Sequence, residues 1–111
     1  MLKRLMNLSG VEAVAHFRET GDLMEAYGDL SEAEKVRLAR LALAYKRAIQ
    51  GHADQLAMFV KDPGWTPANG WIAHGDRRSV CGVSSIVAVV DNEQADLTEV
   101  MREMGREIFL T

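Results

Sequence analysis

Five consecutive apolar residues, Ile86 to Val90, constrain the fold of this chain more than any other segment. A strand with one face in water alternates apolar and polar side chains, whereas this segment is apolar at every position. Both of its faces should therefore be buried, and the strand should lie in the middle of a sheet. We expect a layered α+β fold in which helices cover both faces of that sheet.

Hydrophobic periodicity predicts the other helices and strands. We expect all five strands to be antiparallel. A polar turn containing Gly21 joins the first two strands into a hairpin, with Val11, Ala13, Ala15 and Phe17 on one face of the first strand. In chain order, we expect a short amphipathic helix over Met1–Leu8, strands Val11–Phe17 and Leu23–Tyr27, a long helix from Ser31 to about Met58 or Phe59, strands Trp71–His74, Ser79–Val83 and Ile86–Val90, and a last helix ending near Ile108.

The long helix has the clearest start signal in the sequence. Ser31 and Glu34 have the spacing of a capping box, and Asp96 with Glu99 repeats it before the last helix. Gly51 is a weak point, costing on the order of 1 kcal/mol relative to alanine, and is expected to mark a bend. Apolar residues of the long helix form two adjacent stripes, wider than one sheet face requires, so part of this helix is expected to contact a partner.

Composition excludes several classes of protein. A length of 111 residues fits one domain, residues 1–111, and 48% hydrophobic residues with a net charge of −3 predict a folded chain. A pI near 5.6 argues against a nucleic-acid binder. One cysteine excludes an internal disulfide and a cysteine-rich zinc site. No apolar run approaches the roughly 20 residues of a membrane-spanning helix, so we expect a cytoplasmic protein without membrane insertion.

Catalytic groups are few. Cys81 could act as a nucleophile with His16 or His74 as its base, but an apolar strand is an ordinary place for a buried thiol. The three histidines, including His52, lie in different elements, which argues against a metal site. We therefore expect no enzyme activity, no cofactor and no bound metal.

The segment Lys61–Gly70 is predicted to be a loop and is the most unusual part of the sequence. It contains Trp65, Thr66 and Pro67, and the second tryptophan, Trp71, follows directly. The two tryptophans could cap the hydrophobic core, form a binding edge for a protein partner, or stack on a small ligand. The last alternative would make the chain a small-molecule sensor with a tryptophan-lined pocket.

Several segments resemble the Roadblock/dynein light-chain superfamily. They are the opening Leu5–Ala13, the turn at Gly21–Leu23, the long helix, and Val87–Asp91 before the last helix. Ser9 stands where proline is common in that superfamily. The tryptophan loop is not a general Roadblock feature and resembles that of a small, uncharacterised bacterial subfamily.

The resemblance implies a five-stranded antiparallel sheet in the order 2-1-5-4-3, with the long helix on one face and the two terminal helices on the other. It also implies homodimers in which the third strands pair edge to edge and the long helices pack together. Such dimers are non-catalytic platforms that bind or regulate small Ras-like GTPases or assemble larger complexes. The interface residues expected here are Leu38, Leu41, Tyr45, Ile49, His52, Trp71, Ile72 and Ala73, with Trp65, Thr66 and Pro67 as a candidate partner or ligand loop.

Overall fold

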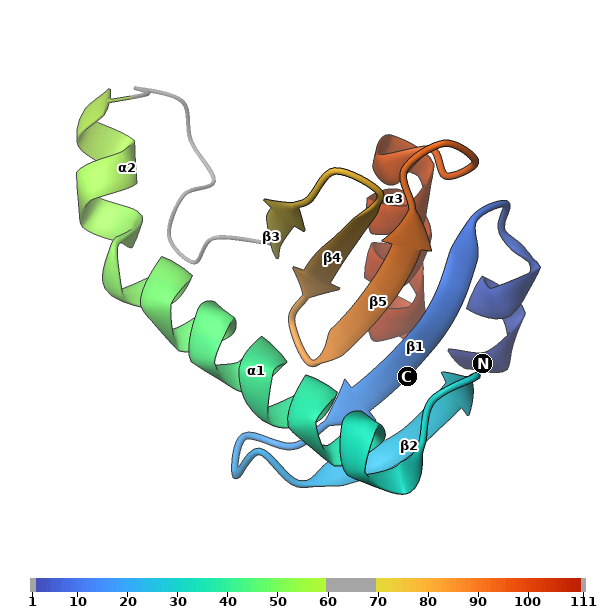
Figure 1. Ribbon diagram of the computed structural model, residues 1–111. Helices are drawn as coiled ribbons and strands as arrows, with labels where there is room; N and C mark the ends of the chain where they lie inside the picture. Colours follow the sequence, from blue (N-terminus) through green and yellow to red (C-terminus); the bar gives the residue numbers. More distant parts are fainter. Residues whose placement is uncertain (1, 60–69, 111) are drawn as a thin grey trace.

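The computed structural model describes residues 2–59 and 70–110. Its centre is one five-stranded antiparallel sheet in the order β2-β1-β5-β4-β3 (Figure 1). The predicted α+β class and strand order are therefore confirmed. The elements are the 3-10 helix η1 (Leu2–Asn7), strands β1 (Val11–Phe17) and β2 (Leu23–Gly28), helices α1 (Glu32–Gly51) and α2 (Ala53–Phe59), strands β3 (Gly70–His74), β4 (Arg78–Val83) and β5 (Ile86–Asp91), and helix α3 (Leu97–Leu110).

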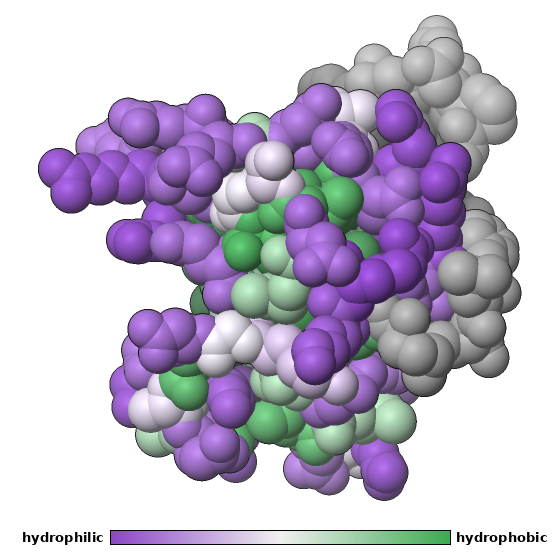
Figure 2. All heavy atoms as spheres, turned by 90° about the vertical axis from the view of Figure 1, so that its right-hand side faces the viewer, coloured by the Kyte–Doolittle hydropathy of each residue, from purple (hydrophilic) through white to green (hydrophobic). Residues whose placement is uncertain are grey.

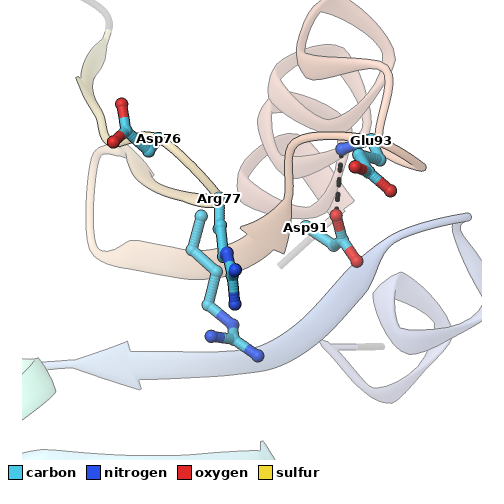
Figure 3. A pocket seen from close by; sticks show the side chains of 5 residues that line it. Asp76, Arg77, Asp91 and Glu93 are labelled. Carbon is cyan, nitrogen blue, oxygen red and sulfur yellow. Dashed lines mark hydrogen bonds between the residues drawn. The ribbon is translucent and has the colours of Figure 1, made fainter.

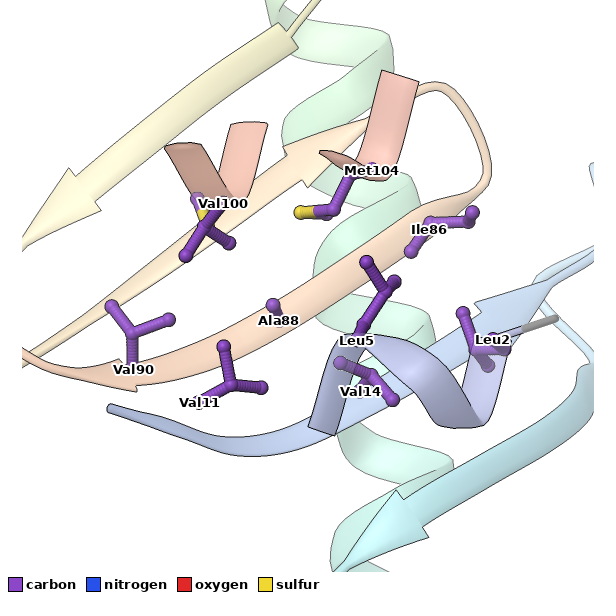
Figure 4. Packing of buried hydrophobic residues seen from close by; sticks show 10 residues of the cluster. Leu2, Leu5, Val11, Val14, Ile86, Ala88, Val90, Val100 and Met104 are labelled. Atoms are coloured by element: carbon purple, nitrogen blue, oxygen red, sulfur yellow. The ribbon is translucent and has the colours of Figure 1, made fainter. Parts of the chain in front are cut away.

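The all-apolar strand β5 lies at the centre of the sheet, between β1 and β4. Ile86, Ala88 and Val90 point into one hydrophobic cluster, and Val87 points into another on the opposite face. The first cluster is closed by η1 and α3 (Figure 4), and its buried residues are Leu2, Leu5, Val11, Val14, Cys81, Ile86, Ala88, Val90, Val100 and Met104. Both faces of β5 are buried, as its sequence predicts.

The second cluster lies between the sheet and α1, which is the main helix on that face (Figure 1). The long helix α1 therefore covers one face of the sheet, and η1 and α3 cover the other. This is the layering that the resemblance implies. The buried residues of the cluster are Ala15, Phe17, Leu38, Ala39, Ala42, Leu43, Trp71 and Val87.

One prediction for β1 is wrong. Strict alternation places Val11 on the same face as Ala15 and Phe17, but Val11 packs with Val14 in the cluster beneath η1 and α3. The register between β1 and β5 shifts between Val11 and Ala13, as at a β-bulge. A bulge adds one residue to one strand, so the side chains before it change face.

The helices also differ in detail from the predictions. The first is a 3-10 helix that ends at Asn7, one residue before the end predicted for the amphipathic helix Met1–Leu8, whose first residue lies outside the described ones. The long helix ends at Gly51 with His52 as its C-cap, and α2 follows as a separate helix, so the helix is interrupted at His52, directly after the weak point at Gly51. Within the described residues, no helix combines the length and apolar character required to span a bilayer.

The capping box at the start of α1 is confirmed. The Glu34 backbone N–H donates to Ser31 Oγ at 3.1 Å, and the Ser31 N–H donates to Glu34 Oε1 at 3.0 Å. The Ser31 contacts hold the pKa of the Glu34 carboxyl below its usual range. At α3 the Glu99 N–H donates to Asp96 Oδ1 at 3.2 Å, which is one of the two contacts expected of a box.

An ion-pair cluster ties the first and last helices together. Arg4 on η1 binds both Glu103, at 2.9 Å, and Glu107 on α3, and the Glu107 side chain is only 2% exposed. Arg4 lowers the pKa of Glu103, and both carboxylates raise the pKa of Arg4. Because the charge of Glu107 is buried, Arg4 provides a counter-charge that water cannot replace there.

We expect Arg4→Met to lower the free energy of unfolding by about 2 kcal/mol, because the buried carboxylate of Glu107 loses the Arg4 guanidinium while the aliphatic packing is kept. The control is Arg106→Met, which removes only an exposed ion pair to Glu103 and should cost less than about 0.5 kcal/mol. Urea unfolding of both variants measures the difference. Equal costs for the two variants would contradict a special role for Arg4.

Candidate interface on the α1 face of the sheet

Helix α1 covers only part of the sheet. Strand register places Ala15, Val87, Gly82 and Trp71 in one row across β1, β5, β4 and β3, and this row lies against α1. In the next row Val89, Val80 and Ala73 are only half-buried. A strip of apolar sheet surface beside α1 is therefore left partly open.

The flank of α1 above this strip is also apolar. Leu41 is 43% exposed and Tyr45 is 40% exposed, one turn apart on the helix. Leu41 and Leu38 line a hollow of about 250 Å³, together with Val89 from the open strip. The hollow is completed by Leu30, Glu34 and Arg37. We call this space the α1 hollow.

Strand β3 borders the same region and is the last strand of the sheet. Trp71 lies on its α1 face, with its ring centroid 4.8 Å from that of Tyr45, and is only 8% exposed. The indole lies where a side chain at Gly82 would stand, which explains a glycine within β4. Among the described strands, β3 has no neighbour on its outer side, so its outer backbone groups are available for pairing.

The predicted interface residues fall into three groups. Leu38 and Trp71 are buried, and Ile49 and Ala73 are half-buried. The exposed members are Leu41, Tyr45, His52 and Ile72.

These residues do not all lie on one face. The flank of α1 brings Leu38, Leu41 and Tyr45 together, but Ile72, which is 47% exposed, pairs with Cys81 and so points to the α3 side of the sheet. Sequence reasoning missed Leu30, in the segment between β2 and α1, and Val89 on β5, because only the packed structure brings both against α1. The candidate loop residues Trp65, Thr66 and Pro67 lie outside the described residues.

Apolar surface also occurs away from α1. Figure 2, seen from the right-hand side of Figure 1, shows hydrophobic side chains gathered in the centre of that face and framed by hydrophilic ones. A hollow of about 530 Å³ lies between η1 and β2 and is lined by Lys3, Arg4, Met6, Asn7, Tyr27 and Gly28. It borders the opposite edge of the sheet from β3.

A third hollow, of about 360 Å³, is polar and lies where the β3–β4 turn approaches the end of β5 (Figure 3). Asp91 Oδ1 accepts the backbone N–H of Glu93 at 2.9 Å, and Arg78 binds Glu12 at 2.5 Å, which raises the pKa of Arg78. The lining carries both signs of charge, with Asp76 and Arg77 at the turn. This hollow therefore does not select one ligand charge.

The candidate catalytic groups are not assembled for nucleophilic chemistry. Cys81 is fully buried in the cluster beneath α3, and burial raises the pKa of its thiol to about 11. His16 Nε2 lies 3.0 Å from Ser85 Oγ, so its described partner is a hydroxyl. Within residues 2–59 and 70–110, no group of three or more His, Cys, Asp or Glu side chains could hold a metal ion.

We expect the Cys81 thiol to react with iodoacetamide at least about 100-fold more slowly in the native protein than in the urea-unfolded chain. A rise from the ordinary value of 9.0 to about 11 reduces the reactive thiolate by that factor, before burial further limits access. Mass spectrometry of quenched time points measures both rates. Comparable rates in the two states would show that the thiol is accessible and activated.

Several solved structures have a similar fold. A Roadblock/LC7 domain from Streptomyces avermitilis matches with a TM-score of 0.78 and 11% identity, over 99% of this chain and 95% of that one. MglB from Myxococcus xanthus matches with a TM-score of 0.66 and 18% identity, over 96% of this chain and 74% of that one. The gliding protein MglB from Thermus thermophilus matches with a TM-score of 0.72 and 18% identity, over 96% of this chain and 78% of that one.

These likenesses establish the fold, which is that of Roadblock/LC7 domains. No curated protein matches the sequence. A family model described as "Uncharacterized conserved protein (DUF2173)" matches residues 1–106, which is nearly the whole chain. The chain therefore belongs to the DUF2173 family, and it has the Roadblock/LC7 fold that its sequence resembles.

Proposed function

We propose that the protein is a homodimeric, non-catalytic interaction module, formed as one domain over residues 1–111, whose dimer binds or regulates another protein. The observation that carries the proposal is the coincidence of three incomplete surfaces on one side of the molecule. These are the edge of β3 that no described strand pairs with, the half-buried strip containing Val89 and Val80, and the exposed flank of α1 at Leu41 and Tyr45.

A second copy related by a two-fold axis at β3 would complete all three surfaces at once. Pairing of the two β3 edges would join two sheets into one and satisfy the outer backbone groups. The two α1 helices would then run antiparallel on the same face of the joined sheet. Each would lie beside the strip that the other leaves open, which removes apolar side chains from water.

The fold supports this arrangement by analogy. One similar solved structure is described as MglB with a tetrameric arrangement, so a protein of this fold assembles from several copies. Proteins of the Roadblock superfamily, which the sequence resembles, serve as platforms for small Ras-like GTPases. We therefore propose a small Ras-like GTPase as the first partner to test, while the fold alone does not determine the partner.

Sedimentation velocity over a range of concentrations tests the dimer, and a purified dimer then serves as bait for crosslinking in the native host. We expect a single dimeric species at micromolar concentration and a reproducibly captured GTPase. A monomer at these concentrations would remove the proposal. A dimer that captures other proteins but leaves GTP binding and turnover of the host's small GTPases unchanged would remove the GTPase assignment alone.

A further inference from the structure

We infer that helix α2 of one copy closes the α1 hollow of the other copy, with Met58 as the side chain that enters it. The inference rests on the proposed dimer and adds a specific contact to it. The α1 hollow is lined by Leu30, Leu38, Leu41 and Val89, and Glu34 and Arg37 form its polar rim. In a single chain, the described residues leave this hollow open.

Packing against the chain's own sheet does not explain the position of helix α2. It follows the break at His52 and extends beyond the β3 edge, away from its own sheet (Figure 1). Met58 is 78% exposed, more than any other large apolar side chain among the described residues. A short helix that carries an exposed methionine past an open sheet edge is suited to contact whatever pairs with that edge.

The lengths of the elements match this contact. Tyr45 lies over β3, and the 13 steps from Tyr45 to Met58 span at most about 20 Å at 1.5 Å per residue, because the two helices meet at a bend. In a dimer paired through β3, the strand β5 of the second copy lies three strand spacings away, about 14 Å. Val89, at the base of the hollow, belongs to that strand. Met58 can therefore reach the second copy's hollow, even with the bend at His52.

The direction of approach is also consistent. The open strip lies on the Leu41 side of α1 and runs from Val89 on β5 to Ala73 on β3, with the α1 hollow at its β5 end. A two-fold axis at β3 brings the second copy's helices to that same side. The contact is reciprocal, so a dimer would contain two such closures.

A disulfide between Arg37→Cys and Met58→Cys tests the inference. Both side chains are exposed in the single chain, so neither change disturbs the core. From Arg37 to the end of α1 at Gly51 the helix already spans about 21 Å, and α2 continues away from the sheet, so a disulfide between these positions can form only between copies. The native thiol Cys81 is replaced by alanine in every variant, and oxidation is read on a non-reducing gel.

We expect the Arg37→Cys, Met58→Cys protein to convert almost fully to a covalent dimer, and a mixture of the two single variants to crosslink as well. The matched control is Arg40→Cys with Met58→Cys, since Arg40 is also exposed and lies outside the hollow; it should give only a trace of dimer. Sedimentation of the reduced proteins separates the possible failures. A non-covalent dimer without crosslinking overturns this inference and leaves the proposed function, whereas a monomer removes both.

Discussion

Replacing Gly10 by alanine is expected to lower the free energy of unfolding by about 3 kcal/mol, a large effect for one added methyl group. Gly10 has φ of +81°, a conformation that costs an L-residue about 1–2 kcal/mol. A Cβ there would also lie 2.5 Å from the backbone nitrogen of Ala95, which cannot move as a side chain would. Strain of that kind adds about 1–3 kcal/mol.

The control for this variant is Gly105→Ala in α3. A Cβ at Gly105 has nothing within 4 Å, and alanine is the better helix former by about 1 kcal/mol. The same added methyl group should therefore stabilise the protein at one position and destabilise it at the other. Chemical unfolding of the two variants measures both values. A loss of less than about 1 kcal/mol in the free energy of unfolding for Gly10→Ala would mean that the loop containing Ala95 shifts to accommodate the methyl group.

Gly10 also illustrates what the sequence could and could not predict. As a glycine after Ser9 it signals the end of the first helix, which is correct. Its close approach to Ala95 joins two segments that are far apart in the chain, and no local pattern contains that information. The hydrogen bond from the Asp91 N–H to the Gly10 carbonyl, at 2.7 Å, belongs to the same long-range junction.

The strands were predictable to within one or two residues because their patterns are local. The run from Ile86 to Val90 predicts a central strand by itself, and the capping box at Ser31 fixes the start of α1. The bulge that moves Val11 to the other face depends on the register with β5, so alternation alone could not find it.

The candidate interface was predictable in part for a similar reason. Helix periodicity shows that α1 carries more apolar surface than one sheet face needs, and the structure leaves Leu41 and Tyr45 exposed on one flank. Which sheet residues face that flank depends on the angle at which α1 crosses the strands. Val89 therefore emerges only from the packed structure, although its position in β5 was predicted.

The second large effect is expected for self-association rather than for folding. Leu41→Lys should weaken the dimer by about 100-fold, because each copy places one charged side chain where an apolar flank is buried. A loss of about 1.4 kcal/mol from each of the two symmetric positions gives that factor. The fold should be little affected, since Leu41 is already 43% exposed in the single chain. Sedimentation equilibrium of wild type and variant measures the change.

Val36→Lys provides the matched control on the same helix. Val36 is 38% exposed, close to Leu41 in accessibility, but it lies outside the α1 hollow and away from Tyr45. The same charge at Val36 should therefore leave the dimer intact. If both variants dissociate equally, the cause is general charge or loss of helix stability. If neither dissociates, the Leu41 flank is not in the interface, and a dimer would then have to use another surface, such as the apolar hollow between η1 and β2.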